Sequence, residues 1–204
     1  DTVSVSSTAT LTIAAGVKVR FAENAQLVSN GRIIANGTST SPVYFMGTGS
    51  NGQGEVYLNG IYSDSLTHCK FFGLENGLKV SNSSSGGVFL NNCDFVASEN
   101  EGLKVTAGTI TIDKCKANDN GTDGMYLYNC TATIDSSSFS GNKSSGIYAY
   151  SVNSSSKFSN STFSENGEGT SSSPEAGIIF YNCSPAIDHC DVSDGGQYGL
   201  YGAN

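Results

Sequence analysis

The sequence lacks long hydrophobic runs and holds few charged residues. No stretch approaches the roughly 18 consecutive apolar residues of a membrane-spanning helix. Charged residues make up 14% of the 204 residues and hydrophobic ones 37%. That is too little charge for a charge-driven disordered chain, and Leu, Ala, Glu and Lys are too sparse for a helical protein. Glycine, with 25 residues, and Ser, Thr and Asn dominate instead.

Basic residues are also scarce. The chain has 10 Lys and Arg against 18 Asp and Glu, which gives a formal net charge of −8. A negative chain repels a phosphate backbone, so nucleic acid is not an expected partner. Insertion into a membrane is not expected either, because no segment is apolar enough. The charge balance fits a neutral or cationic ligand better.

Two motifs repeat in step along the chain. The first is Gly-Φ-x-Φ, where Φ is apolar, and its copies begin at Gly77, Gly102, Gly124, Gly146, Gly177 and, imperfectly, Gly199. The second is an apolar residue, two polar residues, Cys or Ser, any residue and usually another apolar one. It is centred on Cys69, Cys93, Cys115, Ser137, Ser161 and Cys190. Two motifs that stay in step over six copies indicate a repeated structural unit.

The repeat length identifies that unit. Each repeat holds short alternating apolar runs broken by Asn, Asp, Ser and Gly, and none is a helical pattern. About 22 residues of short strands and tight turns make one coil of a parallel β-helix, whose equivalent residues stack about 4.8 Å apart. We expect two inward columns, Leu78, Leu103, Met125, Ile147 and Ile178 in one, and Phe71, Phe95, Phe139 and Phe163 in the other.

Residues 1–59 follow the repeat less clearly. Their alternating apolar runs are separated by Gly, Asn and Pro turns. We predict one domain over 1–204, with 1–59 as irregular opening coils and an end cap and 60–204 as regular coils. A cap is expected because a solenoid must protect its terminal edge.

The repeats and the opening segment "LTIAAGVKVRFAENAQLVSNGRIIANG" resemble the right-handed parallel β-helix (pectate-lyase-like) superfamily of secreted and cell-surface proteins. The resemblance covers essentially the whole chain. It implies an all-β fold, a single-stranded right-handed parallel β-helix solenoid of about eight coils with 22–24 residues per regular coil. It also implies a secreted or cell-surface location. It does not select a function, because the superfamily includes polysaccharide lyases, glycoside hydrolases, phage tailspikes, adhesins and non-catalytic modules.

The six cysteines are expected to be free, buried thiols. Cys69, Cys93, Cys115 and Cys190 share a column that members of this superfamily often fill with stacked Asn. Parallel Cβ atoms in such a column stay further apart than the roughly 3.5–4.5 Å that a disulfide needs. Cys130 and Cys183 lie about two coils apart. His68 and His189 directly precede cysteines, but adjacent side chains on a strand point opposite ways, so a metal site is not expected.

No residue is nominated as catalytic. The lyases of this fold need a basic residue beside a cation or Ca²⁺, and the only candidates are Lys79 and Lys104 with the turn carboxylates Glu75, Glu99, Glu101 and Asp123. The alternative is a charge ladder that solvates a strand face. "NDNGTDG" (118–124) and "DHCDVSDGG" (188–196) resemble calcium loops only in part. We expect no cofactor, with Ca²⁺ as the one alternative.

Tyrosines gather on one predicted face. Six of the ten fall in two neighbouring outward columns: Tyr126, Tyr128, Tyr148, Tyr150, Tyr181 and Tyr201. An exposed aromatic surface of that extent usually marks a binding site. The alternative is a ladder that only stabilises the sheet. The longer segment 164–177 is placed beside this face as one wall of a groove.

These patterns favour a non-catalytic extracellular or cell-surface module that uses the six tyrosines to bind a polysaccharide or a surface protein. One alternative is a polysaccharide lyase or hydrolase acting on the same face. Another is a structural or oligomerising fibre or adhesin segment, in which the tyrosines are buried against a second chain.

Overall fold

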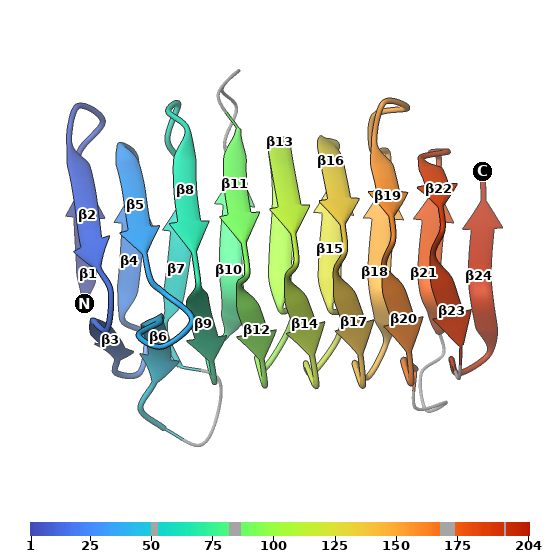
Figure 1. The fold of residues 1–204 in the computed structure, drawn as a ribbon, viewed down its shortest axis with the longest axis horizontal. Helices are drawn as coiled ribbons and strands as arrows, with labels where there is room; N and C mark the ends of the chain where they lie inside the picture. The colour runs from blue at the N-terminus through green and yellow to red at the C-terminus, as the bar shows by residue number, and fades with distance from the viewer. Residues whose placement is uncertain (50–52, 82–86, 168–173, 194) are drawn as a thin grey trace.

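The computed structural model of the chain is a β-solenoid of eight coils followed by one further strand (Figure 1). It describes residues 1–49, 53–81, 87–167, 174–193 and 195–204. These residues contain strands and turns, and no helix long and apolar enough to cross a membrane is found among them. The two termini lie at opposite ends of the solenoid axis (Figure 1). The all-β class and the number of coils predicted from the repeats are confirmed.

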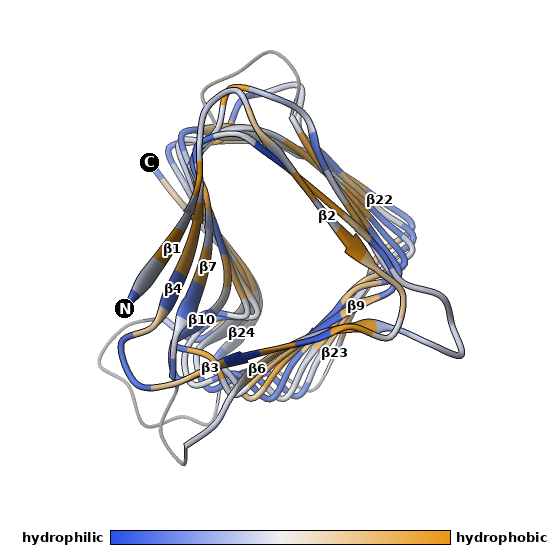
Figure 2. Ribbon diagram, turned by 90° about the vertical axis from the view of Figure 1, so that its left-hand side faces the viewer, coloured by the Kyte–Doolittle hydropathy of each residue, from blue (hydrophilic) through white to orange (hydrophobic). Residues whose placement is uncertain are grey.

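Three parallel sheets, A, B and C, enclose the core, as the view along the axis shows (Figure 2). Sheet A contains β1 (Thr2–Val5), β4 (Gln26–Ser29), β7 (Glu55–Leu58), β10 (Asn76–Ser81), the first half of β13 (Leu103–Asp113), β15 (Met125–Tyr128), β18 (Ser145–Tyr150), β21 (Ala176–Tyr181) and β24 (Tyr198–Ala203). Sheet B contains β2 (Thr10–Ala14), β5 (Arg32–Asn36), β8 (Asp64–Thr67), β11 (Val88–Asn91), the second half of β13, β16 (Cys130–Asp135), β19 (Lys157–Ser159) and β22 (Ala186–Asp188). Sheet C contains β3 (Lys18–Phe21), β6 (Val43–Gly47), β9 (Cys69–Phe72), β12 (Asp94–Val96), β14 (Lys116–Asn118), β17 (Ser138–Ser140), β20 (Thr162–Ser164) and β23 (Asp191–Ser193).

The inward columns lie where the repeats place them. Leu78, Leu103, Met125, Ile147 and Ile178 are neighbours in sheet A and are all nearly inaccessible to solvent. In sheet C, the rings of Phe45, Phe71 and Phe95 stack at 4.7 and 4.8 Å between centroids. Ala117 interrupts this column, and Phe139 and Phe163 resume it at 5.1 Å. Like side chains therefore pack on like, coil after coil, and the core is continuous.

The start of the chain is more regular than its sequence indicates. Strands β1 to β6 form two coils in register with the rest, and Phe45 extends the phenylalanine column. Val3 is 65% exposed, and apolar side chains at the open end line a hollow of about 550 Å³. The division of the chain at residue 59 into opening and regular coils stays a prediction.

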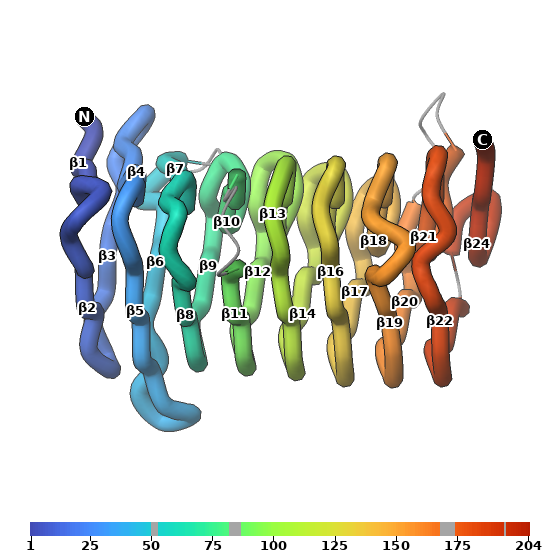
Figure 3. The backbone as a smooth tube through the Cα atoms, turned by 90° about the horizontal axis from the view of Figure 1, so that it is seen from above, coloured from blue at the N-terminus to red at the C-terminus, as the bar shows by residue number. Residues whose placement is uncertain are grey.

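Single residues in the left-handed region turn the chain from one sheet to the next. The corner between sheets B and C uses six of them, with φ between 47° and 53°: His68, Asn92, Lys114, Ser136, Asn160 and His189. Such a residue bends the backbone sharply and directs its side chain away from the core. Longer connections occur in the first coils, where the segment between β5 and β6 extends beyond its neighbours (Figure 3).

A ladder of buried asparagines joins the coils at the corner between sheets C and A. Asn142 is fully buried, and its Nδ2 donates to the oxygens of Asn166 (Oδ1, 2.9 Å) and Ala117 (backbone, 2.9 Å). Its Oδ1 accepts from the backbone N and from Nδ2 of Asn120, at 3.1 and 2.9 Å. The amide thus satisfies its own polar atoms and those of two adjacent coils. The sequence analysis placed the stacked-Asn position in the cysteine column, but the asparagine ladder lies at this different corner.

The cysteine column is also a hydrogen-bond ladder. All six cysteines are free, with Cys69, Cys93, Cys115 and Cys130 buried and Cys183 and Cys190 partly exposed. The backbone N of Cys93 donates to Sγ of Cys115, and the backbone N of Cys115 donates to Oγ of Ser137. Serine therefore replaces cysteine here because both side chains accept the same bond. The hydrogen bond with Cys93 and burial raise the pKa of the Cys115 thiol, and burial raises the pKa of Cys130 to about 12.

A negative charge introduced into the asparagine ladder should destabilise the protein. In Asn142→Asp, a carboxylate oxygen would face two carbonyl oxygens to which Nδ2 now donates. We expect the free energy of unfolding in urea to fall by about 3–5 kcal/mol. The control is Asn118→Asp, because Asn118 is half-buried and uses only its Oδ1, which accepts from the backbone N of Ser140. The control should lose less than about 1 kcal/mol; equal losses in the two variants would contradict a special role for the ladder.

Thiol labelling should separate the two kinds of cysteine. Burial keeps the four inner thiols out of reach of a reagent. We expect a maleimide at neutral pH to modify Cys183 and Cys190 in the native protein and all six thiols after denaturation. Native Cys183→Ser/Cys190→Ser protein should remain unlabelled. Rapid labelling of that variant would show that the inner column opens to solvent.

Candidate binding face

The outer face of sheet A carries a continuous column of side chains, here called the first outer column. Strand pairing places its members side by side in the order Ser4, Val28, Tyr57, Lys79, Lys104, Tyr126, Tyr148, Ile179 and Tyr201. A second outer column, two residues further along the strands, holds Tyr128, Tyr150 and Tyr181. The six tyrosines predicted to share a face therefore lie together, and we call them the tyrosine panel.

The rings of the panel contact one another along the solenoid axis. Tyr126 and Tyr148 stack with 5.5 Å between centroids and 11° between planes. Tyr128 and Tyr150 stack at 5.6 Å and 23°. Tyr181 contacts the rings of Tyr148 and Tyr201 at 5.6 and 5.8 Å in tilted geometry. Such ring pairs stabilise the sheet by about 0.5–1.5 kcal/mol each beyond the area they bury.

Stacking decides which part of each ring is free. Where two rings stack, each loses one face to its neighbour, so the panel presents mainly ring edges and hydroxyls. Tyr128 is the exception. It stacks on Tyr150 on one side, whereas β13 pairs with β15 only as far as Leu127, so Tyr128 has no paired residue on the other side, and it is 41% exposed. It is therefore the panel residue whose ring face is most open to a ligand.

At the C-terminal end of the panel, tyrosine rings surround an isoleucine side chain. Ile179 faces outward between Tyr148 and Tyr201, yet it is only 1% exposed. Because the ring of Tyr181 contacts both of these rings, the three tyrosines gather around Ile179. Tyr198, which the sequence analysis did not single out, adds a fourth ring 5.3 Å from Tyr201 and is 46% exposed. Tyr198 was not predicted to belong to this face because it lies before the glycine of the last, imperfect repeat.

Two lysines adjoin the panel, and each leans away from the other. Lys79 Nζ lies 4.9 Å from the ring centroid of Tyr57 and 3.6 Å from Glu55 Oε1. Lys104 Nζ lies on the opposite side, 5.2 Å from the ring centroid of Tyr126 and 2.9 Å from Glu101 Oε1. In-register pairing would place the two ammonium groups side by side, where they repel each other. Each ammonium group lies instead beside a ring and a carboxylate. Tyr57 was missed because its repeat register was unclear in the sequence.

The carboxylates predicted beside the lysines separate into two groups. Glu101 and Asp123 are buried at the start of sheet A, and Asp123 Oδ1 accepts from the backbone N of Ser145 at 3.0 Å. Burial raises the pKa of Asp123 to about 6, and Glu101 adds repulsion. Glu75 and Glu99 lie instead on the outer corner, where they line a hollow of about 450 Å³ with Glu23.

Residues 54–204 match the model of a protein family described as the right handed beta helix region. The chain belongs to this family. No curated protein and no solved structure matches it. Residues 1–53 lie outside the matched range, but they contribute two coils that pair in register with those of the β-helix family region.

Metal-site geometry is not found in the described part of this β-helix. None of its His, Cys, Asp and Glu residues forms a group of three or more that could hold a metal ion. The segment 118–124, which resembles a calcium-binding loop in part, has structural roles. Asn120 belongs to the asparagine ladder, and Asp123 accepts a hydrogen bond from the backbone N of Ser145. The other calcium-like segment includes Asp194, and the predicted groove wall 164–177 includes 168–173; these residues lie outside those described.

Asp123 should make the stability of this β-helix depend on pH. Its pKa is raised in the folded state, so it adds stability below its unfolded value of 3.8, and that stability is lost as the pH rises through about 6. We expect the wild-type free energy of unfolding to fall by up to about 3 kcal/mol from this source between pH 4 and pH 7. Asp123→Asn keeps the acceptor for Ser145 and should remove that part of the fall. Superimposable pH profiles for the two proteins in urea titrations would contradict this assignment.

Proposed function

We propose that the protein is a non-catalytic extracellular or cell-surface module that binds polysaccharide through the tyrosine panel. The observation that carries the proposal is the panel itself: two stacked ring pairs, Tyr126–Tyr148 and Tyr128–Tyr150, lie side by side on the outer face of sheet A, with 5.5 and 5.6 Å between centroids. This spacing between adjacent coils is close to the rise of one sugar unit in an extended polysaccharide. A chain lying along the solenoid axis would meet one ring pair across two neighbouring coils and then the tilted rings of Tyr181 and Tyr201.

The arrangement offers both kinds of contact that a sugar requires. The open ring face of Tyr128 suits the apolar face of a pyranose. The hydroxyls of the stacked rings provide hydrogen bonds along the same line. A tyrosine hydroxyl keeps its proton at neutral pH and can donate a hydrogen bond, and burial raises the pKa of Tyr126 and Tyr148 further above that range. A rigid row of rings loses little conformational entropy on binding.

The polar residues beside the panel support binding over catalysis. A lysine acting as a general base must reach its substrate, whereas Lys79 and Lys104 are each held in an ion pair, with Glu55 and Glu101. A general acid must touch its substrate, and Asp123 is only 7% exposed. Burial of the panel against a second chain is the remaining alternative, and concentration-dependent light scattering distinguishes it.

Removal of rings should weaken the interaction in a graded way. The wild-type protein is screened on a glycan array, and the affinity for the best ligand is measured by calorimetry. We expect Tyr128→Ala to weaken binding by about two- to tenfold, because one aromatic contact is worth roughly 0.5–1.5 kcal/mol. Tyr148→Ala/Tyr150→Ala should reduce it further, since it removes two hydroxyls and the ring on which Tyr128 packs.

The matched control is Phe89→Ala, which removes an aromatic side chain of similar exposure, 43%, from the outer face of sheet B. It should leave the affinity unchanged. Unchanged binding in the Tyr148→Ala/Tyr150→Ala variant rules out this face as the binding site. The absence of any glycan ligand on the array rules out the polysaccharide proposal.

A further inference from the structure

One face of this acidic protein combines positive charge with exposed apolar side chains. The first five strands of sheet C, β3, β6, β9, β12 and β14, carry four basic residues and one carboxylate: Lys18, Arg20, Lys70, Lys116 and Asp94. Lys114 lies at the corner that leads into β14, so five of the ten lysines and arginines lie on this face. In a chain with a net charge of −8, this concentration of positive charge indicates a contact with an anionic surface.

An apolar column lies beside these basic residues. Strand pairing places Met46, Phe72 and Val96 side by side, two residues further along the strands than the column that contains Lys70. Arg20 continues the apolar column on its N-terminal side. Phe72 is 55% exposed, more than any other aromatic side chain in the described residues, and its two apolar neighbours are half-buried. Three adjoining apolar side chains on an outer face mark a contact surface more strongly than a single one does.

The positive charges are only partly neutralised by the protein itself. Lys70 Nζ lies 3.0 Å from Asp94 Oδ2, and Lys114 Nζ lies 3.7 Å from Asp113 Oδ2. Lys116 has no ion pair in the part of the chain that the structure describes. The side chains of Lys70 and Lys114 are 47% and 62% exposed, so their ammonium groups can reach an approaching surface.

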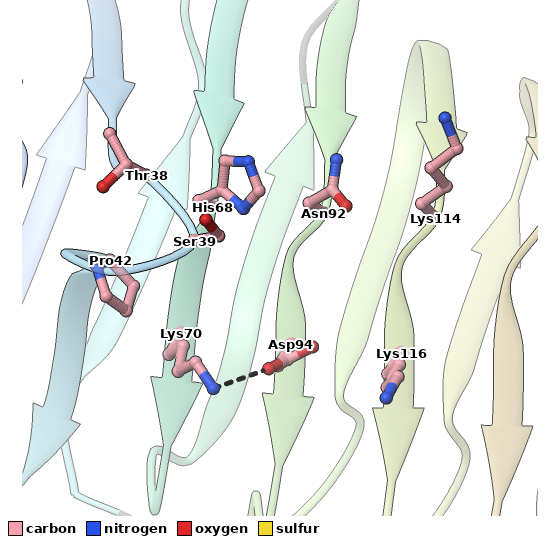
Figure 4. Close-up of a pocket in the computed structure, with 9 residues that line it drawn as sticks. All are labelled: Thr38, Ser39, Pro42, His68, Lys70, Asn92, Asp94, Lys114 and Lys116. Carbon is pink, nitrogen blue, oxygen red and sulfur yellow. Dashed lines mark ion pairs between the residues drawn. The ribbon is translucent and has the colours of Figure 1, made fainter.

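Charged and apolar groups occupy different parts of this face. Lys70, Lys114 and Lys116 border a groove of about 280 Å³ near the corner between sheets B and C (Figure 4). The segment between β5 and β6 forms one side of the groove and adds the hydroxyl of Thr38. Phe72 is not among the residues that line the groove, and its ring is exposed on the neighbouring part of the sheet. The face therefore offers hydrogen-bond donors for phosphate groups and, beside them, an apolar contact.

We propose that this face of sheet C docks on the surface of a membrane rich in anionic lipids, without spanning it. The lysines would lie at the level of the lipid phosphates, and Phe72 with Met46 would enter the boundary between headgroups and acyl chains. Lipids move within a leaflet, so anionic headgroups can gather at each ammonium group. The carboxylates of sheets A and B face away from such a surface, and salt screens charges beyond about 8 Å, so the net negative charge does not prevent the contact.

The combination of charge and apolar surface distinguishes a membrane from other anionic partners. A soluble polyanion, such as an acidic peptide rich in glutamate, would pair with the lysines but leave Phe72 in water. A bilayer uses both, because phosphates and acyl chains lie within about 5–10 Å of each other at its boundary. This surface lies on a different sheet from the tyrosine panel and does not depend on it. A docked protein would leave sheet A free to bind polysaccharide.

Co-sedimentation of the whole chain with lipid vesicles at low salt tests the proposal. We expect binding to vesicles of phosphatidylcholine with an equal amount of phosphatidylglycerol, and not to vesicles of phosphatidylcholine alone. Lys70→Gln and Phe72→Ser should each weaken binding to the mixed vesicles by about three- to tenfold, because they remove a charge and an apolar contact. Asp94→Asn should strengthen it, because it removes the one carboxylate on these strands. A higher salt concentration should weaken binding.

The matched controls lie on the outer face of sheet B. Lys157 is 49% exposed and paired with Asp188, much as Lys70 is paired with Asp94, and Phe89 is 43% exposed. Lys157→Gln and Phe89→Ser should bind the mixed vesicles like the wild type.

Three results overturn the proposal: no binding to the mixed vesicles, equal binding to the neutral ones, or equal weakening by a control and its matched variant. Tighter binding of soluble polyglutamate than of the mixed vesicles identifies an acidic protein partner and also overturns it. Tyr148→Ala/Tyr150→Ala should bind the vesicles unchanged, so this surface and the tyrosine panel can fail separately.

Discussion

The structure depends on in-register pairing of each strand with its equivalent in the next coil. Parallel pairing places equivalent residues about 4.8 Å apart, so every position of the repeat becomes a column along the axis. The corners maintain the register, because the amide of Asn142 bonds both the coil before it and the coil after it. Side chains are therefore selected for what they do when stacked on one another.

Some residue types gain from stacking, and others must be separated. Phenyl rings stack on phenyl rings, and amides of the asparagine ladder donate hydrogen bonds to one another. Cysteine and serine side chains accept a hydrogen bond from the backbone N of the equivalent residue in the coil before. Like charges do not gain from stacking, and the structure separates them in two ways. Lys79 and Lys104 are adjacent but lean towards different rings and carboxylates, whereas Tyr44 and Asp94 separate Lys18, Lys70 and Lys116. In the first arrangement each lysine has its own carboxylate, and in the second a ring or a carboxylate stands between successive lysines.

The sequence predicts the architecture well and the surfaces only in part. Glycine-anchored apolar motifs place the core columns and the tyrosine panel, because a period-2 pattern with a constant repeat allows little freedom of register. The repeat register of the first two coils was less certain, because their apolar runs are separated by irregularly placed Gly, Asn and Pro turns. Asn120 and Asn142 could not be recognised as a ladder in a chain rich in Asn. Which ring face stays open depends on neighbours in the next coil, as the exposure of Tyr128 illustrates.

The central claim is that stacking turns the outer columns of sheet A into a binding surface. The chain has ten tyrosines and no tryptophan, so ring-labelled tyrosine is a direct reporter. NMR spectra of tyrosine-labelled protein, titrated with the strongest glycan ligand of an array, test the claim most directly. We expect shifts for Tyr126, Tyr128, Tyr148 and Tyr150, while Tyr44 and Tyr62, outside the panel, stay unchanged. Binding that leaves the four panel resonances in place would contradict it.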